Sequence, residues 1–186
     1  MPNKEWENML AGQPYRSVDA GLVTLRHRAR RLLAQYRDTD PADANKRYTL
    51  LQELFGKIGQ AVEIEPPFFC DYGSNIYLGE NFYANFNCVI LDPAEVRIGS
   101  NVFLAPGVHI YTAYHPLNPT ERNSGYESAA PVWIGDNVWI GGGAIIQPGV
   151  RIGENTTIGA GSVVTKDIPA NVVAAGVPCR VLRALS

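Results

Sequence analysis

The stretch IGDNVWIGGGAIIQPGVRIGENTTIGAGSVV, residues 134–164, places a bulky aliphatic residue at every sixth position. A small or β-branched residue follows four positions after each of the first five aliphatics. Neither the 3.6-residue period of a helix nor the alternation of a plain strand produces this spacing. Asp136-Asn137, Pro148-Gly149 and Glu154-Asn155 recur in the same phase and supply residues typical of tight turns. The stretch therefore predicts short strands joined at corners and stacked into a solenoid.

The same six-residue phase continues upstream of residue 134. Ile98 and Leu104 keep it, whereas Leu78 and Ile90 are two residues out of step, which predicts a short bulge near 92–95. Between Ile110 and Val132 the aliphatic pattern stops and a polar run rich in Asn, Pro and Gly takes its place. We expect residues 111–131 to form a loop extruded from the coil.

The first sixty residues have helical rather than six-residue periodicity. Ser17 is a candidate N-cap for a helix ending near Arg37, and Asp40-Pro41 with Asp43 opens a second helix that Gly56 and Gly59 can end. Two amphipathic helices are too few for a good core of their own. We therefore divide the chain into a helical segment, 1–60, and a β-solenoid domain, 61–186, and expect the helices to pack against the coil.

Composition describes an ordinary globular protein, 46% hydrophobic and 18% charged, with a formal net charge of −2. The sequence lacks an apolar run long enough to span a membrane and a start resembling a secretory signal, so we expect a cytoplasmic protein without membrane contact. Cys70, Cys88 and Cys179 show no CxxC spacing and are expected to be buried thiols rather than metal ligands or disulfides. The arginines near residues 26–37 indicate a solvated helix face, so no nucleic-acid partner is expected.

Each repeat has an aliphatic residue, a small residue, two free positions, a small or β-branched residue and one free position. This pattern resembles the repeat of the hexapeptide-repeat acyltransferases. Further matching stretches are Glu65 to Pro67, Cys70 to Ile76, Asn81 to Asn87, Tyr111 to Pro116, Ile134 to Gly141 and Val164 to Arg180. They cover nearly the whole chain and are most similar to the maltose and galactoside O-acetyltransferases. Periodicity alone does not set the hand of the coil, but the resemblance implies a left-handed parallel β-helix. It also implies a homotrimer with active sites between subunits.

His115 is the histidine with the best claim to a catalytic role. It stands at the root of the extruded loop, beside Pro116, and a loop on a rigid scaffold is a common place for functional residues. The resemblance makes it the general base that takes a proton from an acceptor hydroxyl as this attacks acetyl-CoA directly in a ternary complex. The family places an oxyanion-binding backbone N–H at Gly142, where serine is common in relatives.

An acceptor rich in hydroxyl groups needs carboxylates and amides that bind several hydroxyls at once. The resemblance places Asp71, Asn85 and Glu127 around a sugar acceptor and aligns Trp139 with an aromatic contact. Asp92 lies in the bulged stretch and is a further candidate. Turn capping is the alternative role for Asn85 and Asp92.

The resemblance also suggests where acetyl-CoA binds. The corresponding residues are Gly142, Ala160, Thr165, Lys166, Arg180 and Arg183. Lysine and arginine suit the anionic nucleotide end of this cosubstrate, and no Walker loop or GxGxxG motif offers another nucleotide site.

Other functions remain open at this point. The acceptor could be maltose, glucose, a galactoside, an aminosugar or a xenobiotic. A zinc enzyme of the γ-carbonic anhydrase kind shares this coil, but His109 and His115 have no third histidine in the coil region, so no metal is expected. A non-catalytic scaffold is the remaining alternative.

Overall fold

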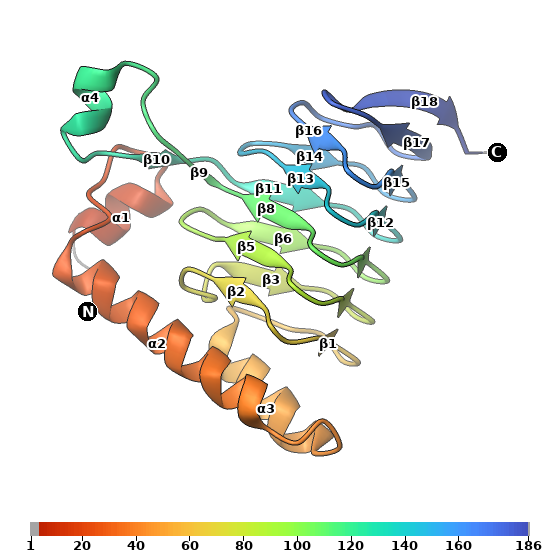
Figure 1. Cartoon of the computed structure of the whole chain (residues 1–186), viewed down its shortest axis with the longest axis horizontal. Coiled ribbons are helices and arrows are strands. Elements are labelled where there is room, and N and C mark those ends of the chain that lie inside the picture. Colours follow the sequence, from red (N-terminus) through yellow and green to blue (C-terminus); the bar gives the residue numbers. More distant parts are fainter. Residues whose placement is uncertain (1–3, 186) are drawn as a thin grey trace.

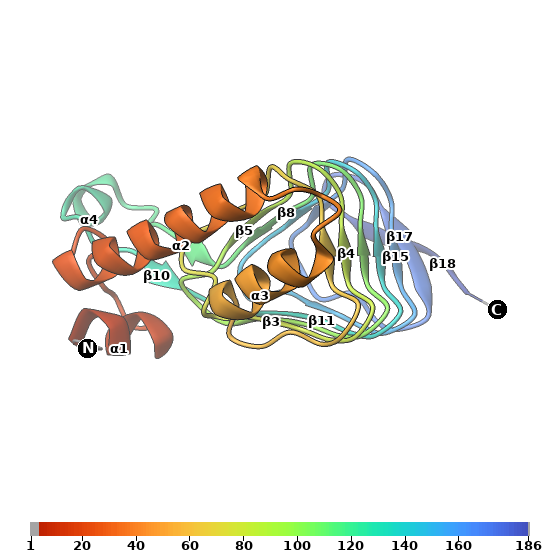
Figure 2. The same cartoon turned by 90° about the horizontal axis from the view of Figure 1, so that it is seen from below.

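The computed structural model describes residues 4–185 and has a left-handed parallel β-solenoid as its main body (Figures 1 and 2). Each coil runs through three short strands, one on each of three faces, and consecutive coils stack along the solenoid axis. The predicted fold class is confirmed. The strands are β1 Glu63–Ile64, β2 Phe69–Cys70, β3 Ile76–Leu78, β4 Tyr83–Ala84, β5 Val89–Leu91, β6 Val96–Ile98, β7 Phe103–Leu104, β8 His109–Tyr111, β9 Ala113–Tyr114, β10 Ser128–Ala129, β11 Val132–Ile134, β12 Trp139–Ile140, β13 Ile145–Ile146, β14 Arg151–Ile152, β15 Thr157–Ile158, β16 Val163–Val164, β17 Val172–Ala175 and β18 Arg180–Ala184.

Three parallel sheets form the faces of the coil. Their strand orders are β1-β4-β7-β12-β15-β17, β2-β5-β8-β13-β16 and β3-β6-β11-β14. The register places residues of like phase one above another, so that Ile134 lies between Ile98 and Ile152. Residues that repeat at six-residue spacing therefore form columns along the axis.

These columns fill the interior of the coil. The six predicted aliphatics from Ile134 to Val164 are all at most 3% exposed, and the five small or β-branched partners are buried as well. Cys70, Cys88 and Cys179 are free and buried, as expected from the sequence. Each Å² of apolar surface removed from water contributes about 25 cal/mol of stabilisation, so this continuous core is the main source of stability.

Asparagine side chains form a ladder along one corner of the coil. Asn81 donates to Asn101, Asn101 to Asn137, Asn137 to Asn155, and Asn155 to Asn171, each from Nδ2 to Oδ1 at 2.9–3.0 Å. All five residues have positive φ, between 53° and 60°. Asparagine tolerates this left-handed conformation better than most residues, so one residue type supplies both the turn and a contact between coils.

Two corners are longer than the six-residue repeat requires. The bulge predicted near 92–95 lies between β5 and β6, and an equivalent corner at 71–75, which the sequence did not reveal, lies one coil earlier between β2 and β3. Asp92 connects the two corners: its carboxylate accepts hydrogen bonds from the backbone N–H groups of Asp71, Tyr72 and Asn75 at 3.0, 2.9 and 3.3 Å.

Helices α2, Ala20–Asp38, and α3, Ala44–Leu54, cover the end of the coil that carries β1 (Figure 2). Leu32, Leu51 and Leu54 belong to the same buried cluster as the first coil residues, as expected for helices without a core of their own. Within residues 4–185, no helix is both long and apolar enough to cross a membrane.

The predicted helix limits need correction at both helices. Ser17 is not the N-cap of α2, because Asp19 Oδ1 accepts the Gly21 and Leu22 N–H groups at 2.8 and 3.2 Å. Asp43 caps α3 as expected, but that helix ends at Leu54 with Phe55 as its C-cap, before Gly56 is reached. A short helix that the sequence did not suggest, α1, covers Lys4–Leu10.

The extruded loop is an ordered arm. Strands β9 and β10 pair antiparallel, and helix α4, Pro119–Asn123, lies at the tip (Figure 1). The chain between α1 and α2 lies against this arm through a reciprocal backbone pair, Tyr15 N to Glu127 O and Glu127 N to Tyr15 O, both at 3.0 Å. A second buried cluster of Met9, Tyr15, Leu22, Tyr72, Ala94 and Ala129 joins the N-terminal segment, the arm and the coil.

Candidate active site

A cleft of about 580 Å³ lies where the arm leaves the coil. Strands β5 and β8 form its floor, the arm contributes Ala113, His115 and Glu127, and helix α2 contributes Arg26. Asp71 enters from the longer corner at 71–75. Three of the predicted site residues, Asp71, His115 and Glu127, thus converge although the chain separates them by up to 56 positions.

His115 and Glu127 face each other across the base of the arm. The imidazole Nε2 is 3.5 Å from Glu127 Oε2, and the two side chains are 60% and 13% exposed. This distance is longer than an ordinary hydrogen bond, so Nε2 is not committed to a protein partner. The Glu127 carboxylate is thus the nearest charged group to this imidazole nitrogen in the cleft.

Asp71 is half-buried at the cleft wall, and burial raises the pKa of its carboxyl group above the ordinary value. The Arg26 guanidinium acts in the opposite direction, and the Glu127 carboxylate raises the pKa further. Two carboxylates and one cation therefore share this side of the cleft. Such a group offers several acceptors to a ligand that carries hydroxyls.

Asp92 does not line the cleft, contrary to its predicted role as an acceptor contact. Its side chain is fully buried beneath the 71–75 corner, and Asn75 Nδ2 donates to its backbone oxygen at 2.7 Å. Burial raises the pKa of Asp92 to about 7. The geometry matches the alternative of turn capping, because the carboxylate fixes the corner that carries Asp71.

Arg26 and Tyr72 belong to the cleft although sequence reasoning did not select them. Arg26 Nη1 donates to the Tyr72 hydroxyl at 2.8 Å, and Nη2 donates to the Ser17 carbonyl at 2.6 Å. Burial raises the pKa of Tyr72 to about 12. The helical pattern predicts a solvated position for Arg26. Its orientation toward the cleft depends on how closely α2 approaches the arm, and the sequence pattern does not show that approach.

Asn85 and Trp139 lie elsewhere on the same chain. They line a separate concavity of about 420 Å³ with Tyr83, Phe103, Leu104 and Ala105, along β4, β7 and β12. Trp139 and Phe103 are 53% and 49% exposed. Within one subunit, these two predicted acceptor contacts are therefore not part of the cleft that holds His115.

The predicted acetyl-CoA residues lie at one corner of the coil and at its last turn. Gly142 is at the corner between β12 and β13, and Ala160 is at the equivalent corner between β15 and β16. Gly142 accepts a hydrogen bond from Gly161 N at 2.9 Å, and its own N–H has no partner among residues 4–185. A Cβ built there would lie 3.1 Å from Pro106 O, so glycine accommodates a close approach of two coils. Ala160, Thr165 and Lys166 are exposed, as are Arg180 and Arg183 on β18.

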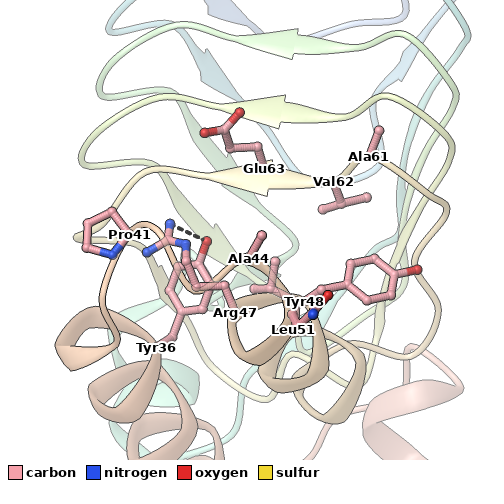
Figure 3. A pocket seen from close by; sticks show the side chains of 10 residues that line it. Tyr36, Pro41, Ala44, Arg47, Tyr48, Leu51, Ala61, Val62 and Glu63 are labelled. Carbon is pink, nitrogen blue, oxygen red and sulfur yellow. Dashed lines mark hydrogen bonds between the residues drawn. The ribbon is translucent and has the colours of Figure 1, made fainter.

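A further concavity, of about 480 Å³, lies between α3 and β1 (Figure 3). Arg47 Nη2 donates there to the Tyr36 hydroxyl at 2.7 Å and to Ile64 O at 3.0 Å, which ties α3 to α2 and the first coil. None of the predicted site residues lines it. Across residues 4–185, no three His, Cys, Asp or Glu side chains gather in a way that could hold a metal ion.

Family models match two parts of the chain. Residues 8–59 match the maltose acetyltransferase hexapeptide capping motif, and residues 131–166 match the bacterial transferase hexapeptide repeat. A putative acetyltransferase of Saccharomyces cerevisiae is 55% identical over 97% of this chain and 92% of its own length. The galactoside O-acetyltransferase of Escherichia coli K12 is 46% identical over 97% of this chain and 89% of its length. The chain belongs to the hexapeptide-repeat acetyltransferases.

Solved structures of hexapeptide-repeat acetyltransferases superpose on nearly the whole chain. A maltose O-acetyltransferase from Clostridium difficile 630 has a TM-score of 0.97 at 51% identity, covering 99% of this chain and 98% of its own. A galactoside acetyltransferase in complex with coenzyme A has a TM-score of 0.94 at 46% identity, covering 100% and 92%. A relative from Vibrio cholerae, complexed with acetyl-CoA, has a TM-score of 0.91 at 37% identity, covering 99% and 100%.

Proposed function

We propose that this protein transfers an acetyl group from acetyl-CoA to a hydroxyl group of a sugar, with His115 as the general base. The observation that carries the proposal is the convergence of His115, Glu127 and Asp71 in one cleft of a hexapeptide-repeat acetyltransferase. An unassisted hydroxyl is hardly ionised near neutral pH. A base in hydrogen-bond reach of it contributes about 10²–10⁴ in rate.

The reaction is a direct transfer within a ternary complex. His115 takes the proton as the hydroxyl oxygen attacks the thioester carbonyl, so a C–O bond forms and a tetrahedral oxyanion results. The unpaired N–H of Gly142 is the candidate donor to that oxyanion. The C–S bond then breaks, and the imidazolium returns its proton to the coenzyme A thiolate.

Glu127 and Asp71 have distinct roles in this mechanism. Glu127, 3.5 Å from His115 Nε2, stabilises the imidazolium by its charge. Asp71, which lines the same cleft, accepts hydrogen bonds from other hydroxyls of the acceptor. Asp92 acts on the acceptor only through the corner that holds Asp71.

The complete site requires a second copy of the chain. Asn85, Trp139 and Gly142 come to the cleft of His115 from a neighbouring subunit in a homotrimer. The separate position of Asn85 and Trp139 within one chain supports this arrangement, as do the exposed aromatic rings around them. Acetyl-CoA follows the coil edge past Ala160 and Thr165, and its phosphates meet Lys166, Arg180 and Arg183.

The test compares His115→Ala with a matched histidine control. His27 is exposed on α2 and lines no part of the cleft, so His27→Ala should retain wild-type turnover. Acetyl-CoA consumption is measured against a panel of maltose, glucose, galactosides and aminosugars, with folding checked by circular dichroism. His115→Ala should lose at least 10²-fold in kcat while remaining folded. Unchanged turnover in His115→Ala would remove the mechanism, and turnover confined to non-sugar acceptors would remove the substrate class.

The oligomeric proposal has its own test. Sedimentation equilibrium should give three times the chain mass of 20.3 kDa. Mixing inactive His115→Ala with inactive Asn85→Ala protein, after dissociation and reassembly, should restore part of the activity, because some mixed sites receive both native residues. A monomer with full activity would contradict the shared site.

A further inference from the structure

The Tyr15 hydroxyl is the one buried side-chain polar atom without a hydrogen-bond partner among residues 4–185. The ring is completely buried with Met9, Tyr72 and Ala129. An unsatisfied hydroxyl at such a site is costly, and buried tyrosines usually find a partner. A phenylalanine would fill the same apolar space without that cost, so the hydroxyl calls for a functional explanation.

Glu127 is the group that lies in position to accept from this hydroxyl. Tyr15 and Glu127 form a reciprocal backbone pair at 3.0 Å in both directions, so their Cα positions are fixed opposite each other. Burial raises the pKa of Tyr15 above its ordinary value, and the neighbouring Glu127 carboxylate raises it further. Residues directly opposite in an antiparallel pair carry their side chains on the same face, so the Tyr15 hydroxyl and the Glu127 carboxylate are on one side of this bridge.

We propose that Tyr15 is a positioning residue: its hydroxyl donates to the Glu127 carboxylate and so holds that carboxylate against His115. The inference rests on the proposed function, in which Glu127 stabilises the imidazolium. The carboxylate is only 13% exposed and faces His115 Nε2 at 3.5 Å. Arg26, a cation, lines the same cleft and is a competing partner for this carboxylate. A donor behind Glu127 selects the orientation that serves catalysis.

This role explains the path of the N-terminal segment. The chain between α1 and α2 lies against the arm beside β10, and the buried ring of Tyr15 anchors it there. The segment thus places an O–H group behind a residue that lies 112 positions later in the chain. Packing alone would need only the aromatic ring.

Tyr15→Phe tests the hydroxyl, with Tyr126→Phe as a matched control. Tyr126 precedes Glu127 on the same arm, but the residue is 37% exposed and its ring lies under Arg16. Tyr15→Phe should lower kcat about tenfold with an unchanged KM for acetyl-CoA, because a hydrogen bond to a charged group is lost. Tyr126→Phe should remain within twofold of wild type.

The Glu127→Gln background separates positioning from a structural effect. If the Tyr15 hydroxyl acts through the Glu127 carboxylate, adding Tyr15→Phe to Glu127→Gln should change kcat less than twofold. A further tenfold loss in the double variant would overturn the proposal. So would a Tyr15→Phe protein that is fully active and has a higher melting temperature, since that is the behaviour of an unpartnered buried hydroxyl.

A readout independent of turnover distinguishes this inference from the proposed function. The imidazole resonances of His115 in NMR spectra should move in Tyr15→Phe and stay in place in Tyr126→Phe. If no sugar is acetylated by the wild type, the proposed function fails while these spectra still decide the coupling between Tyr15 and His115. Unmoved resonances in Tyr15→Phe would refute the coupling.

Discussion

The asparagine ladder allows a stability prediction whose magnitude follows from the geometry. Asn137 is an interior rung: it accepts from Asn101 at 3.0 Å and donates to Asn155 at 2.9 Å, with φ of 57°. Asn171 is an end rung with φ of 60° and one such bond, from Asn155 at 2.9 Å. Replacement by alanine costs about 1 kcal/mol for the left-handed backbone at either position. It also costs about 0.5–1 kcal/mol for each exposed side-chain hydrogen bond.

These numbers predict different losses for the two rungs. Asn137→Ala should lower the free energy of unfolding by about 2–3 kcal/mol and Asn171→Ala by about 1.5–2 kcal/mol. Because the backbone strain is common to both, their difference isolates one side-chain bond. The double variant Asn101→Ala with Asn137→Ala should cost less than the sum of its parts, since the two residues share a bond.

Urea unfolding followed by circular dichroism at one fixed protein concentration measures these losses. Asn123→Ala is the control, because Asn123 lies on the exposed tip helix α4 outside the ladder, and it should stay within about 0.5 kcal/mol of wild type. Equal losses at Asn137 and Asn171, or strict additivity at Asn101 and Asn137, would show that the ladder bonds contribute nothing measurable.

Three further predictions concern single residues. Burial raises the pKa of Asp92 to about 7, so between pH of about 4 and 7 the folded chain holds a proton that the unfolded chain has released. The free energy of unfolding should therefore fall as pH rises through this window, by up to about 1.4 kcal/mol per pH unit, and Asp92→Asn should remove that component; an identical pH dependence in both proteins would disprove it. Asp19→Ala removes the acceptor for two N–H groups at the start of α2 and should cost about 1 kcal/mol in thermal unfolding, whereas Ser17→Ala should cost less; the reverse order would contradict the cap assignment. Lys166→Ala should raise the KM for acetyl-CoA about fivefold at low salt and leave kcat unchanged, and a KM insensitive to both the substitution and salt would exclude contact with the phosphates.

The coil was predictable because its signal is local. Each six-residue unit contains its own inward aliphatic and its own turn, so the phase from Ile134 to Val164 determines which residues are buried. The helices of the first sixty residues were equally visible, but the cap was not: Ser17 and Asp19 are both good N-cap residues, and only the direction of the entering chain distinguishes them.

The site was predictable in its residue types and only partly in its arrangement. His115 was indicated by its place at the root of the arm, and resemblance to a family supplied Asp71 and Glu127. Asp92 is buried because two longer corners, one coil apart, contact each other through its carboxylate. A single sequence does not indicate such a contact between coils. Tyr15 and Arg26 reach the arm through tertiary contacts from the N-terminal segment, so helix periodicity could not select them.

The two ends of the coil differ from its middle in a way that limits assembly. A parallel stack exposes unpaired backbone groups at its first and last coils, and such edges can recruit further chains without limit. At the first coil, helices α2 and α3 lie over the edge, and at the last coil β18 runs antiparallel beside β17 with a bulge between Val173 and Ala174 (Figure 1). Both devices break the repeat that an incoming copy would have to match. The molecule can thus be built from a fibre-like motif and still remain a particle of finite size.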